Sequence, residues 1–591
     1  MCGLFGIINK DKDTINVAEL RAAGAALQHR GPDDEGIFVE AQLGLAHRRL
    51  SIFDLGAGGR QPFEDWNKVL VFNGAIYNFP EIKIQLTAMG YHFKTATDTE
   101  VLLAAYDHWG KNCVHQFNGQ WAFAIYDRET QQVFCSRDRL GIKPFYYTVI
   151  DNQFCFSSEI KAFAQISGWQ PTLNPTKAYE YLAHQMHDHT NETMFANVYR
   201  LGSGQHLCYS LEEHTFVIDT YYDLTKLKTV ATTVTEAVAA FSEKFTQAIE
   251  LRLRADVQVG AALSGGLDSS AIVLTIPEIK NNISLSTFSV VYDEAKISER
   301  KYVDAVLKND NLIGHVLQPT FVDFENARKS ILWQQEEPYN GMGVEAQYAM
   351  FSAVREAGVK VMLDGQGADE ILAGYEKFYL GMLRSNTDLT EKIKMGYQLV
   401  RLHQIPWKKS WQDFKNYLSK SKANTNFVWL KIKPEQAKLF RRSKEDTVLA
   451  MSKNLISELG LNALLRYEDK NAMAFGIESR VPFLDHKLVE FCLSLPDNLK
   501  IRKGIRKWIL RESRKKILPE IILNRYDKLG FATPERTWLS EQKESYLEKI
   551  KINKRLNDLV DKTKLDEIED VMILWRIYLL GEWMEIFKIE Q

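Results

Sequence analysis

Short hydrophobic segments separated by turn residues dominate the first two hundred residues of the chain. They are rich in aromatic and β-branched residues, which favour strands. Helical stretches are interleaved near residues 17–28 and 98–109. We therefore expect an α+β domain with stacked sheets over residues 1–205. The strand candidates are residues 69–72, 121–126, 133–135, 145–147 and 154–156.

The pattern changes from about residue 235, where longer helical segments alternate with buried strands. Helix 236–253 leads to a strand at 257–263, then to a glycine turn and a helix that starts at Asp268. Further buried-strand candidates lie at 285–292 and 359–363. This alternation predicts an α/β domain with a doubly wound parallel sheet. The chain after about residue 380 is mainly helical, and residues 206–591 form the second predicted domain.

Composition describes an ordinary globular protein that is too long for one core. The chain has 591 residues, of which 45% are hydrophobic and 25% charged. A net charge of −2 favours neither nucleic acid nor a membrane surface as a partner. No segment approaches the roughly 18 apolar residues of a membrane span, and the N-terminus lacks the features of a signal peptide. We expect a cytoplasmic protein.

The six cysteines are too sparse for a disulfide framework, and no two have metal-ligand spacing. Cys2 is distinctive because it follows Met1 directly. Removal of Met1 would leave Cys2 with a thiol and a free α-amine, which titrates at about pH 8. That amine can act as general base for the thiol of the same residue. The alternative is a buried cysteine in an N-terminal strand.

A glycine turn joins the strand at 257–263 to the following helix. Its sequence is Ser264-Gly265-Gly266-Leu267-Asp268-Ser269-Ser270. Two glycines let backbone N–H groups converge, and the helix N-terminus adds partial positive charge. The turn therefore suits phosphate or pyrophosphate, although it lacks the Gly-Lys-Ser/Thr of a Walker motif. Such a turn also occurs as ordinary structure at helix starts.

A second glycine-bracketed turn, residues 364–370, follows the strand at 359–363. Ligands bind at the carboxyl ends of strands in open α/β sheets. The acidic residues here could hold Mg²⁺ on a nucleotide, since hard oxygen ligands suit that ion. An ordinary strand-to-helix turn with Asp369 near the cap is the alternative.

A basic stretch at Arg502–Lys516 contains eight Lys or Arg residues. We interpret it first as a solvated helix face. The second interpretation is a positive rim for a phosphate substrate.

Polar turn residues in the N-terminal half could bind an amino-acid substrate around Cys2. Arg49 could form a bidentate hydrogen bond with a carboxylate, Asp98 could bind an ammonium group, and Asn73-Gly74 could donate to an oxyanion. Glutamine needs these contacts while a thiol attacks its side-chain amide. Alternatively, Asn73-Gly74 is a hairpin turn and Arg49 forms a surface ion pair.

The motifs together resemble a known family over nearly the whole chain, in the family's order. The first set resembles a class II glutamine amidotransferase domain: Cys2-Gly3-x-x-Gly6, HRGPDDEG, HRRLSIFD, NGxIYN, DTE, RDRLGIKPFYY and SSEIKA. The second set resembles the synthetase domain of glutamine-hydrolysing asparagine synthetase: SGGLDSS, FSVVYDE, DGQGADEILAGY, ESRVPFLDH and DKLGFATP. The resemblance implies an N-terminal-nucleophile hydrolase domain with stacked antiparallel sheets between helices, followed by an ATP-pyrophosphatase-type domain.

The resemblance also implies residue roles. Cys2 would be the nucleophile, Asn73 and Gly74 the oxyanion hole, and Arg49 and Asp98 the glutamine-binding residues. Pyrophosphate and metal would be bound by Ser264, Gly265, Gly266, Asp268 and Ser269, and the adenosine bordered by Ala262, Leu263, Val290, Asp364 and Gly365. Mg²⁺ would lie at Asp268 and Asp369, and Lys528 would neutralise phosphate charge.

The implied reaction has two halves. Cys2 releases ammonia from glutamine through a thioester, and the second domain uses ATP and Mg²⁺ to adenylate a carboxylate, with aspartate as the first choice. Ammonia then displaces AMP to form the amide. The same machinery acting on a sugar acid or a peptide side chain is an alternative, and so is a non-catalytic regulatory or binding protein. A homodimer is left open.

Two positions depart from the family pattern. The family's usual NGEIYN has Ala75 in place of the glutamate, which removes a carboxylate near the glutamine ammonium. The usual SGEG turn is Asp364-Gly365-Gln366-Gly367, so Gln366 stands at a catalytic position. An amide cannot serve as general base, and Asp364 and Asp369 are the nearest carboxylates in the sequence.

Overall fold

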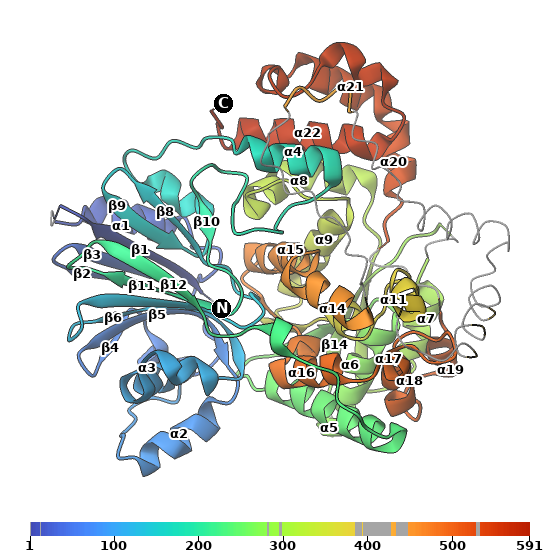
Figure 1. The fold of residues 1–591 in the computed structure, drawn as a ribbon, viewed down its shortest axis with the longest axis horizontal. Coiled ribbons are helices and arrows are strands. Elements are labelled where there is room, and N and C mark those ends of the chain that lie inside the picture. Colours follow the sequence, from blue (N-terminus) through green and yellow to red (C-terminus); the bar gives the residue numbers. More distant parts are fainter. Residues whose placement is uncertain are drawn as a thin grey trace.

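The N-terminal half consists of two antiparallel sheets packed face to face (Figure 1). The computed structural model describes residues 2–11, 14–280, 283–294, 298–384, 390, 393, 397, 427–432, 447–526 and 532–590. The first sheet has the order β10-β8-β9-β1-β3-β2 and the second β12-β11-β7-β6-β5-β4. The strands of the first are β1 (Gly3–Asn9), β2 (Asp34–Glu40), β3 (Leu43–Arg49), β8 (Tyr146–Ile150), β9 (Gln153–Ser157) and β10 (Tyr199–Arg200). Those of the second are β4 (Phe63–Asp65), β5 (Lys68–Ile76), β6 (Gly119–Asp127), β7 (Gln132–Arg137), β11 (Gln205–Ser210) and β12 (Thr215–Thr220).

Hydrophobic side chains from both sheets form the core between them. Leu4 and Leu45 of the first sheet pack in one cluster with Val71 and Ala124 of the second. Helix α1 (Val17–Ala25) packs on the outer face of the first sheet and α3 (Asp98–Trp109) on that of the second. The predicted arrangement of stacked antiparallel sheets between helices is confirmed.

The N-terminal sheets extend beyond the expected domain boundary at residue 205. Strand β11 starts at that residue and pairs with β7, with Leu207 opposite Cys135. Strand β12 pairs with β11 and ends at Thr220. Because Leu207 and Tyr209 lie in the core between the two sheets, residues 205–220 belong with the N-terminal layers.

A parallel sheet forms the centre of the second half, as predicted. Its order is β15-β14-β13-β16-β17, and every neighbouring pair is parallel. The chain therefore turns from one side of β13 to the other, which creates a switch point at the carboxyl end of that strand. The strands are β13 (Val259–Ala262), β14 (Leu285–Val290), β15 (Leu312–Leu317), β16 (Val361–Leu363) and β17 (Glu478–Arg480).

Helices cover this sheet and form the C-terminal part of the chain (Figure 1). None of the helices within the described ranges has both the length and the apolar character to cross a membrane. Besides α1 and α3, the helices are α2 (Phe79–Ala88), α4 (Pro175–His184), α5 (Val234–Arg252), α6 (Leu267–Ile279), α7 (Arg300–Val306), α8 (Phe321–Gln335), α9 (Gly343–Glu356), α10 (Ala368–Ile371), α11 (Phe378–Arg384), α14 (Val448–Ser457), α15 (Leu461–Ala474), α16 (His486–Ser494), α17 (Asp497–Lys500), α18 (Trp508–Arg514), α19 (Glu520–Leu523), α20 (Glu535–Glu541), α21 (Lys543–Ile552) and α22 (Val571–Ile586).

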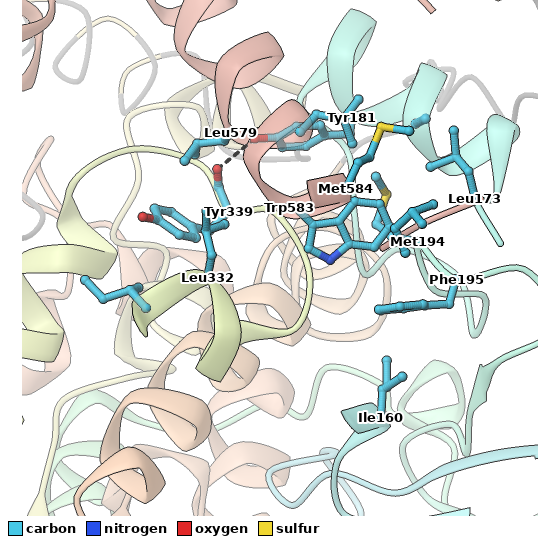
Figure 2. Close-up of a cluster of buried hydrophobic side chains, with 14 of the residues drawn as sticks. Ile160, Leu173, Tyr181, Met194, Phe195, Leu332, Tyr339, Leu579, Trp583 and Met584 are labelled. Atoms are coloured by element: carbon cyan, nitrogen blue, oxygen red, sulfur yellow. Dashed lines mark hydrogen bonds between the residues drawn. The ribbon is translucent and has the colours of Figure 1, made fainter. Parts of the chain in front are cut away.

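A hydrophobic cluster and buried ion pairs join the two halves. Figure 2 shows Phe195 beside Trp583 of α22, with the hydroxyl of Tyr181 donating to the carbonyl oxygen of Tyr339 at 2.9 Å. Buried Arg30 pairs with Glu159 at 2.7 Å and, across the interface, with Asp469 of α15 at 2.9 Å. These contacts hold the N-terminal sheets against the C-terminal half.

Candidate active sites

Cys2 lies in the wall of a small cavity between the two halves. The cavity measures about 30 Å³. The backbone N–H of Cys2, just before β1, donates to Oδ1 of Asn73 at 3.0 Å. Burial raises the pKa of the Cys2 thiol, so the thiol needs a base to become a nucleophile. The lining residues are Cys2, Arg49, Leu50, Ile52, Phe53, Gly59, Gln61, Phe72, Gly74, Thr97, Asp98, Thr99 and Glu478.

Asn73 and Gly74 lie near Cys2 on β5. The side-chain nitrogen of Asn73 is buried and has no hydrogen-bond partner among the described residues, which suits a donor kept for an oxyanion. A Cβ atom at Gly74 would lie 2.1 Å from the carbonyl oxygen of Gln120, so only glycine fits this position. The pair lies inside the antiparallel ladder of β5 and β6 and is not a hairpin turn.

Arg49 and Asp98 lie on the same cavity wall, although they are 49 residues apart in sequence. The guanidinium of Arg49 is buried and donates to the carbonyl oxygens of Asp54 at 2.5 Å and Gly56 at 2.6 Å, which contradicts a surface ion pair. Asp98 begins α3 and accepts from the N–H of Ile76 at 3.0 Å. Burial raises the pKa of Asp98 to about 7.

A carboxylate from the second half lines the Cys2 cavity, which sequence reasoning missed. Glu478 begins β17 and pairs with Nε of Arg480 at 2.5 Å. Burial works against its ionisation, but the Arg480 guanidinium prevails and lowers the pKa of Glu478 to about 2. A negative charge therefore stands at this cavity although Ala75 has none. Glu478 is the first residue of the ESRVPFLDH motif, but that motif did not indicate a place at the Cys2 cavity.

A much larger cavity, of about 800 Å³, opens at the carboxyl ends of β13 and β16. Gly265 is the one predicted nucleotide residue that is absent from its wall; its carbonyl oxygen accepts from Arg525 at 3.0 Å. The predicted residues that do line it are Ala262, Leu263, Ser264, Gly266, Asp268, Ser269, Val290, Asp364, Gly365, Gln366 and Asp369.

The glycine turn before α6 is built as an anion site would be. The hydroxyls of Ser264 and Ser269 lie 3.0 Å apart, and the N–H of Gly266 donates to the Ser264 hydroxyl at 3.2 Å. Gly265 has a φ of +71°, and a Cβ there would approach the Cβ of Tyr302 to 2.7 Å. The turn places the positive end of α6, a helix of 13 residues, at the cavity.

The two predicted metal ligands come together across the cavity. Asp268 and Asp369 share the ammonium of Lys507, at 2.5 and 2.7 Å. Among the described residues, no cluster of three or more His, Cys, Asp or Glu side chains is arranged to hold a metal by itself. Two carboxylates already facing one cation fit Mg²⁺ that brings phosphate oxygens as its further ligands.

The basic stretch at 502–516 is only partly the solvated face that we expected first. Arg506, Lys507 and Arg511 line the large cavity, and Arg506 and Lys507 are buried. Lys503, Lys515 and Lys516 are exposed. The second interpretation, a positive rim for phosphate, therefore suits the buried members. Lys507 stands just before α18 with a φ of +52°, and Arg511 lies within that helix.

Gln366 lies in the cavity wall two residues from Asp364. Asp364 accepts from the N–H of Gly365 at 2.5 Å, yet burial raises the pKa of its carboxyl to about 6. A carboxylate thus stands near the amide of Gln366. Lys528 lies outside the described residues.

Known proteins resemble both halves. Residues 1–222 match a family described as glutamine amidotransferase domain, and residues 240–576 match the family described as asparagine synthase. Asparagine synthetase [glutamine-hydrolyzing] 1 of Bacillus subtilis is 29% identical over 99% of this chain and 97% of its own. Putative asparagine synthetase [glutamine-hydrolyzing] 2 of Methanocaldococcus jannaschii is 35% identical over 64% of this chain and 76% of its own. Amidase chry2 of Gibberella zeae is 27% identical over 95% of this chain and 90% of its own. Since one family covers more than half of the chain and its relatives extend over nearly all of it, this protein belongs to the asparagine synthase family.

Proposed function

We propose that this protein is an ATP-dependent asparagine synthetase that takes its nitrogen from glutamine. The observation that carries the proposal is a pair of cavities with complementary chemistry. One holds a thiol beside polar anchors for an amino acid, and the other holds a phosphate turn, two carboxylates and several cations. The products would be asparagine, glutamate, AMP and pyrophosphate.

In the first cavity, Cys2 attacks the side-chain amide of glutamine. Once Met1 is removed, the α-amine of Cys2 takes the proton of the buried thiol. The oxyanion of the tetrahedral intermediate accepts from Asn73 and from the backbone at Gly74. Collapse of the intermediate releases ammonia and leaves a thioester, which water hydrolyses to glutamate.

Charged groups on the wall hold the amino-acid end of glutamine. Arg49 binds the α-carboxylate, and Asp98 binds the α-ammonium when ionised. Glu478 supplies the second negative charge that Ala75 cannot provide. The C-terminal half thereby contributes to the glutamine site.

In the second cavity, the carboxylate of aspartate attacks the α-phosphorus of ATP. Pyrophosphate leaves into the turn at Ser264–Ser269, where backbone N–H groups and the start of α6 face it. The cations Arg506, Lys507 and Arg511 stabilise the negative charge that moves onto this leaving group. Mg²⁺ bound at Asp268 and Asp369 would draw further charge from the phosphates. Lys528 is proposed to assist from the neighbouring segment.

A short stretch of β17 connects the walls of the two cavities. Glu478 lines the Cys2 cavity, and the carbonyl oxygen of Arg480, two residues later on β17, accepts from the N–H of Asp364 at 2.9 Å. We propose that ammonia crosses between the cavities at this stretch of β17.

We also propose that the glutaminase domain ends after Thr220.

A different acceptor carboxylate is the second candidate. Two features support it: Gln366 departs from the family pattern, and relatives of similar coverage include proteins named amidases. The halves and their order would be unchanged, and only the carboxylate that receives AMP would differ.

The test is pyrophosphate release with glutamine or ammonia and a panel of carboxylic acids. We expect aspartate to give AMP, pyrophosphate and asparagine in equal amounts. Formation of ADP contradicts the proposal, and release with another acid alone transfers it to that acceptor. No ATP consumption with any acid points to a non-catalytic protein.

A further inference from the structure

Glu535 is a carboxylate of the large cavity that no predicted motif includes. It follows directly after the DKLGFATP motif and begins α20. Its side chain lines the cavity together with residues of the loop between α8 and α9. In that loop, the backbone N–H of Met342 donates to Oε2 of Glu535 at 2.8 Å. A Cβ atom at Gly341 would lie 2.8 Å from the same oxygen, so the glycine lets the carboxylate lie against the loop.

The packing of α20 holds Glu535 at the wall of the cavity. Trp538, one turn later on α20, packs edge-on against Tyr292 with ring centroids 5.7 Å apart. Tyr292 lines the cavity two residues after the end of β14, the strand that neighbours β13. Trp538 also packs against Phe324 of α8, again with centroids 5.7 Å apart. The start of α20 is therefore fixed near the carboxyl end of the parallel sheet, where ligands bind.

Glu535 differs from the acidic pair of the same cavity in its partners. Asp268 and Asp369 share the ammonium of Lys507. Glu535 forms no ion pair within the part of the chain that the structure describes. Oδ1 of Asn340, another residue of the α8–α9 loop at the cavity, also has no hydrogen-bond partner among the described residues. A carboxylate and an amide oxygen are acceptors for the three donors of an ammonium group. ATP brings no such cation, so another ligand of the cavity must supply it.

We propose that Glu535 binds an ammonium group of the acceptor and thereby selects an amino acid as the substrate that receives AMP. The inference rests on the proposed function and names the substrate class of the same site. The acceptor places the carboxylate to be adenylated toward the Ser264–Ser269 turn and its ammonium group toward Glu535, with Asn340 as a second acceptor. Aspartate carries both groups, whereas a sugar acid has no cation for Glu535. Hydrogen bonds between two charged groups are about twice as strong as neutral ones, so this contact discriminates between the two classes of acid.

The substitution Glu535→Gln removes the charge but keeps the shape of the side chain and an acceptor for the N–H of Met342. The KM for aspartate in pyrophosphate release should rise by about tenfold to a hundredfold, the loss expected for one hydrogen bond to a charged group. The kcat and the KM for ATP should stay within about threefold, because the contact binds ground state and transition state of the acceptor equally. Glu541→Gln, at the exposed end of the same helix, is the matched control and should change neither KM.

Succinate, which is aspartate without its amino group, tests the same contact from the substrate side. In the wild-type enzyme its KM should be at least tenfold above that of aspartate, or release should be absent. Where succinate is used, Glu535→Gln should leave its KM within about threefold, since no ammonium group is lost. Enzyme and substrate changes then form a cycle in which the two losses are not additive. The wild-type comparison decides the matter if Glu535→Gln does not fold.

The outcomes separate this inference from the proposed function. A KM for the acceptor within threefold of wild type in Glu535→Gln, an equal rise for succinate, or a rise in the KM for ATP alone overturns the inference and leaves the proposed function intact. Release with another amino acid but not with aspartate, with a KM that rises in Glu535→Gln, supports the inference and contradicts aspartate as the acceptor. Release only with acids that have no ammonium group contradicts both.

Discussion

The Cys2 cavity and the nucleotide cavity differ most in how much space they leave. The first measures about 30 Å³, close to the volume of one water, and the second about 800 Å³. Glutamine can therefore enter the first only if lining residues move, whereas the second is already wide enough for a nucleotide. Residues of both halves line the small cavity, while the large one is lined by residues of the second half. Of the two cavities, the one at Cys2 is therefore the place where residues of both halves meet.

The largest expected effect comes from removing the nucleophile. Cys2→Ala should reduce glutamine-dependent asparagine formation to background, because a methyl group cannot attack an amide. Ammonia-dependent formation should stay within about twofold, since activation occurs in the other cavity. Both rates are measured as asparagine released with glutamine or ammonium as the only nitrogen source. Glutaminase activity near wild type would show that Cys2 is not the nucleophile.

A substitution in the acidic pair of the large cavity should have the opposite effect, with adenylate formation lost and glutamine hydrolysis retained. Asp268→Ala removes one proposed metal contact and frees Lys507 from half of its pairing. Adenylate formation, followed as pyrophosphate release, should fall by about 10²-fold or more, while glutamine hydrolysis by Cys2 continues. Ser264→Ala, which also lines the cavity but carries no charge, is the matched comparison and should lose less. Equal losses of both activities in Asp268→Ala would contradict separate sites.

Glu478 sharpens the comparison because it belongs to one half and lines the cavity of the other. Glu478→Gln should raise the KM for glutamine by about tenfold or more, the loss expected for one charge-assisted hydrogen bond of about 1.5–3 kcal/mol. The KM for ammonia should not change. The same increase in both KM values would mean that the substitution disturbs the interface rather than the glutamine site.

The smallest expected effect is a pH dependence at the thiol site. Asp98 must be ionised to bind the glutamine ammonium, and its pKa is raised to about 7 by burial. Protonation of Asp98 should therefore lower the kcat/KM for glutamine as the pH drops below 7, by up to about tenfold per unit. Asp98→Asn should remove this limb together with most of the affinity. A limb that persists in Asp98→Asn would assign it to another group.

Local sequence patterns predicted the parts of each site that one turn or strand provides. The strand, the Ser264–Ser269 turn and the start of α6 were expected in that order, because strand burial, glycine and helix start act over a few residues. Arg49, Asn73 and Asp98 were also expected near Cys2, from motifs that the family shares. Arg49 and Asp98 line the Cys2 cavity, and Asn73 accepts from the backbone N–H of Cys2.

The remaining residues depend on packing between distant segments. Lys507 belongs to a basic stretch that composition favours as solvated, and only its burial against Asp268 and Asp369 reveals its place. Glu478 reaches its position because β17 packs against the N-terminal half. The boundary expected at 205 did not include β11 and β12, whose place in the N-terminal sheet comes from the pairing of β11 with the distant strand β7. Contacts between segments so far apart in the sequence produce no repeating pattern of hydrophobic and polar residues from which they could be predicted.

Direct transfer of ammonia between the unequal cavities is the central claim, and one isotope measurement tests it. The enzyme is given glutamine labelled with ¹⁵N in the side-chain amide, together with ATP, aspartate and excess unlabelled ammonium in solution. Asparagine is then analysed by mass spectrometry for ¹⁵N in its amide. Internal passage across the layer at β17 predicts asparagine that stays mostly labelled despite the excess. Asparagine whose label is diluted to the level of the solution would contradict it, since ammonia would then have left the Cys2 cavity before reaching the adenylate.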